Sequence, residues 1–187
     1  MKMLLNKLPK GRITRWGFLA MLLVAVGATA GWMNQRHYQM GGSWVGKGNG
    51  TVWTALHAPL NPEADANASQ VQFQSYGADI AGLIAAFGGD RMSEMTGEGK
   101  MINRDTAKWT LVGYVKAGEN PPQIVAIIIG HGTWKYTDRD HAVLNYTIDT
   151  YPAAADADGD GMPDPGATPA VTTPNVIDTA QRVPILR

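Results

Sequence analysis

The chain of 187 residues contains no cysteine. This absence excludes disulfide bonds, thiolate metal sites, a cysteine nucleophile and lipid attachment at an N-terminal cysteine. The sequence also lacks the Gly-x-Ser-x-Gly turn of serine hydrolases, a phosphate-binding loop, the His-Glu-x-x-His zinc motif and a dinucleotide-binding fingerprint. Common enzyme motifs are therefore missing, and the fold must be stable without covalent cross-links.

Positive charge is scarce after the first 30 residues. The formal net charge of the chain is zero, but five basic residues and no acidic residue precede Gly31. The remaining residues, 31–187, carry 11 basic and 16 acidic side chains. A surface with this excess of acid does not attract phosphate backbones, so no nucleic-acid partner is expected.

Long hydrophobic runs are also absent from the N-terminal region. The apolar stretch at residues 17–27 has eleven residues, short of the roughly 20 that a membrane-spanning helix needs. It follows a basic segment and precedes Ala28-Thr29-Ala30, a pattern that signal peptidase accepts. We therefore predict a signal peptide over residues 1–30 and export to the periplasm or the extracellular space. The alternative is an uncleaved signal that anchors the protein in the membrane.

Alternation of apolar and polar residues dominates from Ser43 to Tyr151 and predicts β-strands. Short polar breaks between the later runs favour antiparallel hairpins. The predicted fold class is mainly β: an antiparallel barrel of six to eight strands, or a strongly curved sheet, with one short helix packed against it. This domain is expected over residues 31–154. Its strand candidates are 44–52, 70–76, 92–104, 108–116, 124–136 and 141–151, with a further one at 182–186.

The alternation assigns one apolar face to the interior of this fold. In the first run that face is expected to hold Trp44, Gly46, Gly48, Gly50 and Val52. Pairs of inward glycines recur in three runs and would let a sheet bend or another strand approach closely. The candidate ligand-binding residues on this face are Trp44, Phe73, Met95, Met101, Trp109, Trp134 and Tyr146.

Three polar residues stand between those paired glycines. Lys47, Glu98 and His131 each occupy the middle of a Gly-x-Gly triplet. They could be assembled into a catalytic cluster, but the alternation points all three outward, away from the apolar interior. We interpret them as solvated positions in the middle of bent strands.

One segment breaks the alternation. In Gly77–Gly89 the apolar residues Ile80, Leu83, Ile84 and Phe87 recur at the spacing of a single helical face, and Gly88-Gly89 supplies a C-terminal stop. The outer face of the run at 124–136 carries Val125, Ile127 and Ile129, and we expect the helix to cover it. The alternative is that this face is a subunit interface.

Two segments read as irregular structure. The connection Ala55–Ser69 contains two prolines and is long for a hairpin, so it is predicted to be a loop or lid on which His57 is incidental. Pro165–Thr179 is rich in proline, threonine and alanine and is predicted to be an extended arm.

Asp156–Asp164 is the most informative motif of the sequence. Aspartates at positions 1, 3 and 5, a glycine at position 6 and an aspartate at position 9 place several oxygens around one point, as calcium requires. Position 12 is Ala167 rather than glutamate, so the loop is not an EF-hand. The alternative is an acidic, solvated linker. The expected ligands are Asp156, Asp158, Asp160, the carbonyl of Met162, and Asp164.

The same nine residues resemble the thrombospondin type 3 calcium repeat, whose Asp-x-Asp-x-Asp-Gly-x-x-Asp core they match in a single copy. The resemblance implies calcium as the cofactor. We therefore assign residues 155–187 to a calcium loop followed by a proline-rich C-terminal arm.

A second resemblance concerns the fold. Gly42-Ser43-Trp44 is similar to the Gly-x-Trp signature of lipocalin-like barrels, and Gly132-Thr133-Trp134 repeats the pattern. The resemblance implies a closed or nearly closed antiparallel barrel whose apolar interior can hold a small lipophilic ligand.

These observations favour an exported, calcium-binding β-barrel that acts as a non-catalytic binding or interaction module, with a small lipophilic molecule as its ligand. One alternative is a subunit of a cell-envelope or extracellular assembly, which would contact a protein partner or a second copy through the C-terminal arm or the outer face of 124–136. The other alternative is a barrel-type isomerase or cyclase that uses Tyr146 or Asn103 inside an apolar cavity.

Overall fold

The computed structural model describes residues 41–48, 51–59 and 68–184. The predicted signal peptide lies outside the described residues. Within the described part of the chain, no helix is both long and apolar enough to cross a bilayer. The elements are β1 (Gly42–Gly48), β2 (Thr51–Pro59), β3 (Ala68–Gly77), α2 (Ala78–Ala86), β4 (Arg91–Met92), β5 (Met95–Met101), β6 (Thr106–Ala117), β7 (Gln123–Tyr136), β8 (His141–Pro152), the 3₁₀ turn η2 (Ala153–Ala155) and β9 (Val171–Arg182).

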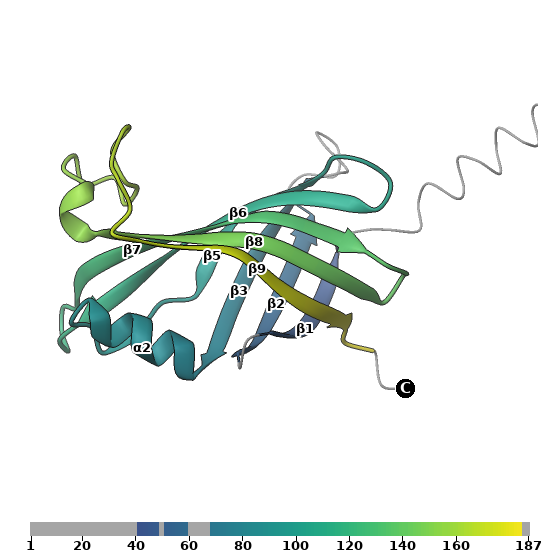
Figure 1. Ribbon diagram of the computed structural model, residues 1–187, viewed down its shortest axis with the longest axis horizontal. Coiled ribbons are helices and arrows are strands. Elements are labelled where there is room, and N and C mark those ends of the chain that lie inside the picture. The colour runs from purple at the N-terminus through teal and green to yellow at the C-terminus, as the bar shows by residue number, and fades with distance from the viewer. Residues whose placement is uncertain (1–40, 49–50, 60–67, 185–187) are drawn as a thin grey trace, which may run out of the picture. The chain divides into compact units, whose positions relative to one another are not determined.

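Eight of these strands form a closed antiparallel barrel (Figure 1). Hydrogen bonds join β1, β2, β3, β5, β6, β7, β8 and β9 in that order, and β9 pairs back onto β1. The short β4 pairs only with the end of β6 among the described strands. The predicted fold class is confirmed, and the eight strands of the barrel are the upper limit of the predicted six to eight.

The period-two alternation explains the interior of the barrel. All seven residues assigned to the inner face belong to one hydrophobic core or pack against it. Trp44, Trp53 and Trp134 are fully or almost fully buried, and the ring of Trp134 packs edge to face with those of Trp44 and Trp53, with ring centres 5.2 and 5.7 Å apart. Such ring pairs add to the stabilisation that their buried apolar area provides. One end of the barrel is therefore tightly packed with aromatic side chains.

The paired glycines permit close approach between strands, as predicted. A side chain at Gly97 would overlap the backbone of the neighbouring β6, and one at Gly132 would overlap the backbone of β8. Lys47, Glu98 and His131, which stand between the paired glycines, are exposed on the outer surface, which confirms their outward orientation.

The first predicted strand is wrong in its boundaries. Gly48 pairs with Thr51, so the run 44–52 spans the end of β1 and the start of β2, which form a hairpin, and Gly50 lies outside the described residues. The reversal shifts the alternation by one residue, so Val52 faces outward at 50% exposure while Trp53 is fully buried. The predicted loop Ala55–Ser69 is also wrong in its boundaries, because Ala55 lies inside β2 and Ser69 lies inside β3.

The predicted extended arm is wrong for Val171–Thr179, because these residues belong to β9, the strand that closes the barrel. The expected strand at 182–186 is displaced, since β9 ends at Arg182. The β8–β9 pairing shifts register, so Pro174 and Asn175 have no partner in the ladder, and Asn175 has a positive φ of 55°. A bulge tolerates proline because it leaves the missing N–H out of the ladder.

The predicted helix is confirmed, but its position is not. Gly88 has a positive φ of 71° and its N–H bonds the carbonyl of Ala85, which ends the helix as expected. The apolar stripe of α2 packs against the core at one end of the barrel, mainly beside β2, β3 and β4, rather than on the outer face of β7 (Figure 1).

The segment after β8 covers the outer face of β7 instead. Tyr114, Ile127 and Tyr151 form one row across β6, β7 and β8, and Ile127 is only 1% exposed. The turn η2 packs on β7 and β8, and the hydroxyl of Tyr114 donates a hydrogen bond to the carbonyl of Gly161 at 3.2 Å. The acidic segment is therefore docked against the barrel wall.

Candidate functional site

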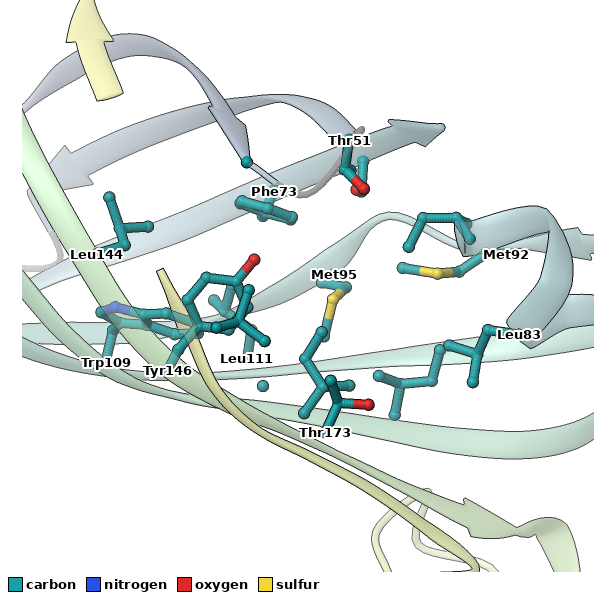
Figure 2. Close-up of a pocket in the computed structure, with 17 residues that line it drawn as sticks. Thr51, Phe73, Leu83, Met92, Met95, Trp109, Leu111, Leu144, Tyr146 and Thr173 are labelled. Atoms are coloured by element: carbon teal, nitrogen blue, oxygen red, sulfur yellow. The ribbon is translucent and has the colours of Figure 1, made fainter. Parts of the chain in front are cut away.

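A cavity of about 290 Å³ lies inside the barrel at the end where α2 packs (Figure 2). Its walls come from strands on all sides of the barrel and from one face of the helix. The lining residues are Gly48, Thr51, Phe73, Ser75, Ile80, Leu83, Met92, Met95, Trp109, Leu111, Ile128, Gly130, Leu144, Tyr146, Ile148, Thr173 and Val176.

The cavity wall is mainly apolar and contains no charged side chain among the described residues. Its polar side chains are the hydroxyls of Thr51, Ser75, Tyr146 and Thr173 and the indole of Trp109, whose Nε1 is buried without a hydrogen-bond partner among the described residues. An apolar concave surface with a few placed hydroxyls is typical of sites for small molecules.

The seven predicted ligand-binding residues divide between the two ends of the barrel. Phe73, Met95, Trp109 and Tyr146 line the cavity. Trp44, Met101 and Trp134 belong to the packed core away from the cavity lining. Sequence reasoning missed Ile80 and Leu83 of α2, because it predicts the helix on the outer face of residues 124–136. It missed the wall residues of β9 because it predicts an extended arm there.

A buried carboxylate stands beside the cavity. Asp178 of β9 is 1% exposed, and its Oδ2 accepts hydrogen bonds from Trp53 Nε1 at 2.7 Å and from the Tyr146 hydroxyl at 2.8 Å. Its Oδ1 has no hydrogen-bond partner within the described part of the chain. Sequence reasoning missed Asp178, because a charged residue stands between Val176 and Ala180 on the inward face of β9 and breaks the apolar pattern of a strand.

Tyr146 joins this carboxylate to the cavity. Burial raises the pKa of the Tyr146 phenol well above its usual value, and the hydrogen bond to Asp178 and the nearby charge of its carboxylate raise it further. The phenol therefore stays protonated at physiological pH. Because its proton is bonded to Asp178, its oxygen can only accept a hydrogen bond from a further partner.

His57 lies at the packed end of the barrel rather than on a surface loop, which corrects the prediction. It is 2% exposed, its ring forms a T-shaped pair with the Trp134 ring with ring centres 4.7 Å apart, and neither ring nitrogen has a hydrogen-bond partner among the described residues. Burial lowers the pKa of His57 to about 4, and the positive charge of Arg182 contributes further. The imidazole is therefore neutral in the folded protein at pH 7.

Asn103, the second residue of the isomerase alternative, is not in the cavity. It is exposed on the turn between β5 and β6, where its side-chain oxygen accepts a hydrogen bond from the Asp105 N–H at 3.0 Å. It therefore cannot act together with Tyr146 on a molecule inside the barrel.

The acidic loop brings three of its carboxylates together. Ligating oxygens of Asp156, Asp158 and Asp164 lie within 4.8 Å of one another, a spacing that a hard divalent cation can bridge. Asp160 lies outside this group, and its Oδ1 accepts a hydrogen bond from the Met162 N–H at 2.8 Å.

Backbone N–H groups also hold these carboxylates in place. Asp156 accepts hydrogen bonds from Gly159 and Gly161 at 2.8 and 3.0 Å, and Asp164 accepts one from Ala157 at 3.1 Å. The loop is thus preorganised by its own backbone.

Comparison with known proteins adds little to this geometry. No protein-family model matches the chain, and no curated protein matches it. The solved structure of EF1p2_mFAP2b bound to DFHBI is similar to it, with 13% sequence identity, a TM-score of 0.48, and coverage of 81% of this chain and 99% of that one. At this TM-score the likeness carries no argument about function.

Proposed function

We propose that the protein binds a small, mainly apolar molecule in the cavity of its barrel. The observation that carries this proposal is a cavity of about 290 Å³ whose wall is apolar except for four hydroxyls and the indole N–H of Trp109. Removing apolar ligand surface from water supplies roughly 25 cal/mol per Å², and the hydroxyls orient the molecule.

Binding is favoured over catalysis by the chemistry of the wall. Tyr146 is the only side chain in the described lining that titrates, and its raised pKa keeps it neutral. A neutral phenol whose proton is bonded to Asp178 is a hydrogen-bond acceptor rather than a general base.

Calcium and export complete the proposal. The carboxylates of Asp156, Asp158 and Asp164 would hold the cation, and binding there would fix the segment that covers Ile127.

The basic and apolar leader at residues 1–30 supports export. Sequencing of the native protein should begin at Gly31, whereas recovery of intact Met1 in a membrane fraction would contradict cleavage.

The binding site is tested by filling the cavity. Ile148 lines it, whereas Asn145 is exposed on the outer face of the same strand. The neutral dye N-phenylnaphthylamine, which fluoresces in apolar surroundings, should bind the wild type and the Asn145→Trp variant equally. Ile148→Trp should weaken binding by about tenfold or more, because the indole occupies the space of the ligand. Equal binding to both variants would place the dye outside the barrel and contradict the proposal.

A further inference from the structure

A carboxylate buried in a barrel wall without a cation is costly, and Asp178 is such a group. Transfer of an unpaired charge from water into a protein interior is strongly unfavourable. Asp178 forms no ion pair within the described part of the chain, and only one of its two oxygens receives hydrogen bonds.

The fold makes specific room for this carboxylate. A methyl group at Gly48 would overlap Asp178 Oδ1, so the carboxylate lies directly against the backbone of Gly48. Gly48 and Tyr146 both line the cavity, and both contact Asp178. The carboxylate therefore belongs to the wall of the cavity, one layer behind its surface.

This arrangement fixes the polarity of the part of the wall around Tyr146. The indole N–H of Trp53 and the hydroxyl proton of Tyr146 are both used on Asp178 Oδ2. The phenol oxygen of Tyr146 and the free Oδ1 are both acceptors. Since the described lining contains no lysine, arginine or histidine, nothing charged in that wall compensates an anionic ligand.

We propose that the cavity selects apolar molecules that carry a hydroxyl or N–H donor, which bonds the oxygen of Tyr146, and that Asp178 makes the site reject anionic molecules such as carboxylates. This inference rests on the proposed function and specifies its ligand class. Asp178 acts as a positioning residue, because it orients the Tyr146 hydroxyl. Its negative charge also makes the electrostatic potential in this part of the cavity unfavourable for anions.

The test uses three molecules with one apolar body: methyladamantane, adamantanemethanol and adamantane carboxylate. None absorbs where tryptophan does, so the tryptophan emission of the protein, to which Trp109 in the cavity wall contributes, reports binding. Adamantanemethanol should bind about threefold to tenfold more tightly than methyladamantane, the effect of one hydrogen bond, and the carboxylate more weakly than either.

Two variants separate the roles of the pair. Tyr146→Phe should abolish the advantage of adamantanemethanol while methyladamantane still binds. Asp178→Asn should let the amide donate to the Tyr146 oxygen, which frees the phenol proton for the ligand. The preference for adamantanemethanol over the carboxylate should then fall by about tenfold. Thr179→Ala, at the exposed neighbouring position of β9, is the control and should leave the relative affinities of the three molecules unchanged.

The outcomes distinguish this inference from the proposed function. Binding of all three molecules with equal affinity to the wild type would overturn the inference and leave the binding cavity intact. Tight binding of the carboxylate, or a preference that survives Asp178→Asn in a folded variant, would also overturn it. Failure of every molecule to bind would overturn both.

Discussion

Burial inside the barrel couples the titration of His57 to folding. The pKa of His57 falls from 6.5 to about 4 on folding, mainly through desolvation, so the unfolded chain binds more protons between these pH values. The free energy of unfolding should therefore rise with pH through this window. It should be fully developed above pH 6.5 and should decline as the pH falls towards 4, by on the order of 3 kcal/mol.

The His57→Phe variant should remove this contribution. Because both ring nitrogens are buried without partners, an apolar ring should cost little stability at pH 7 and should flatten the curve between pH 4 and 6.5. Urea unfolding at a series of pH values measures the effect. Leu56→Phe, at the exposed neighbouring position of β2, is the matched control and should retain the slope of the wild type. An unchanged slope in His57→Phe would show that the imidazole is not the coupled group.

The sequence contained the signal that places His57 inside, although the signal is weak. Trp53, Ala55 and His57 alternate strictly, but alanine contributes little hydrophobicity and histidine none. The two prolines that favoured a loop are Pro59, at the last position of β2, and Pro62, outside the described residues. The burial of Asp178 is harder to predict from the sequence, because an inward aspartate contradicts the pattern that predicts a strand. Large apolar residues such as Trp109 and Trp134 were placed correctly because their burial dominates the local preference.

At the scale of the elements, the acidic loop should respond to calcium independently of the barrel. A ligand that binds only the folded state stabilises it by about 2.7 kcal/mol at a hundredfold excess over Kd. For a domain of this size that corresponds to a rise in Tm of about 5–10 °C. The rise should be visible by thermal melting in millimolar calcium, because the cation relieves repulsion among Asp156, Asp158 and Asp164.

The matched variants are Asp158→Ala in the loop and Glu119→Ala in the exposed β6–β7 turn. Asp158→Ala should abolish the rise and remain folded, since the loop lies on the outside of the barrel. Glu119→Ala should keep it. A melting curve that calcium leaves unchanged, together with no heat on titration, would reduce the segment to an acidic linker.

Element boundaries were predictable where alternation is uninterrupted and not where it reverses. The strands β6, β7 and β8 follow the sequence pattern closely. The β1–β2 hairpin did not, because Gly46, Gly48 and Gly50 give the sequence an apparent alternation that continues through the reversal. In β9 the bulge at Pro174 and Asn175 breaks the period in mid-strand. The spacing of the apolar residues in α2 predicted a helix. Its position on the barrel could not be predicted in this way, because it depends on contacts with residues distant in the sequence.

For the whole molecule, closure of the barrel depends on its last strand. β9 pairs with β8 on one side and with β1 on the other. It also places the guanidinium of Arg182 4.4 Å from the centre of the Trp44 ring, a cation–π contact at the packed end. The first and last strands therefore complete the core together, although they are far apart in the sequence.

A chain that ends at Ala170 should consequently fail to fold. It would leave β1 and β8 with open edges and would remove Val176, Asp178 and Ala180 from the interior. Unpaired edges template aggregation, and the missing wall exposes the tryptophan cluster to water. Circular dichroism should show no cooperative melt, and size-exclusion chromatography should show aggregates. A chain that ends at Pro184 keeps all of β9 and should melt like the full-length protein. Cooperative melting of the shorter chain near the full-length Tm would mean that the barrel is stable without its eighth strand.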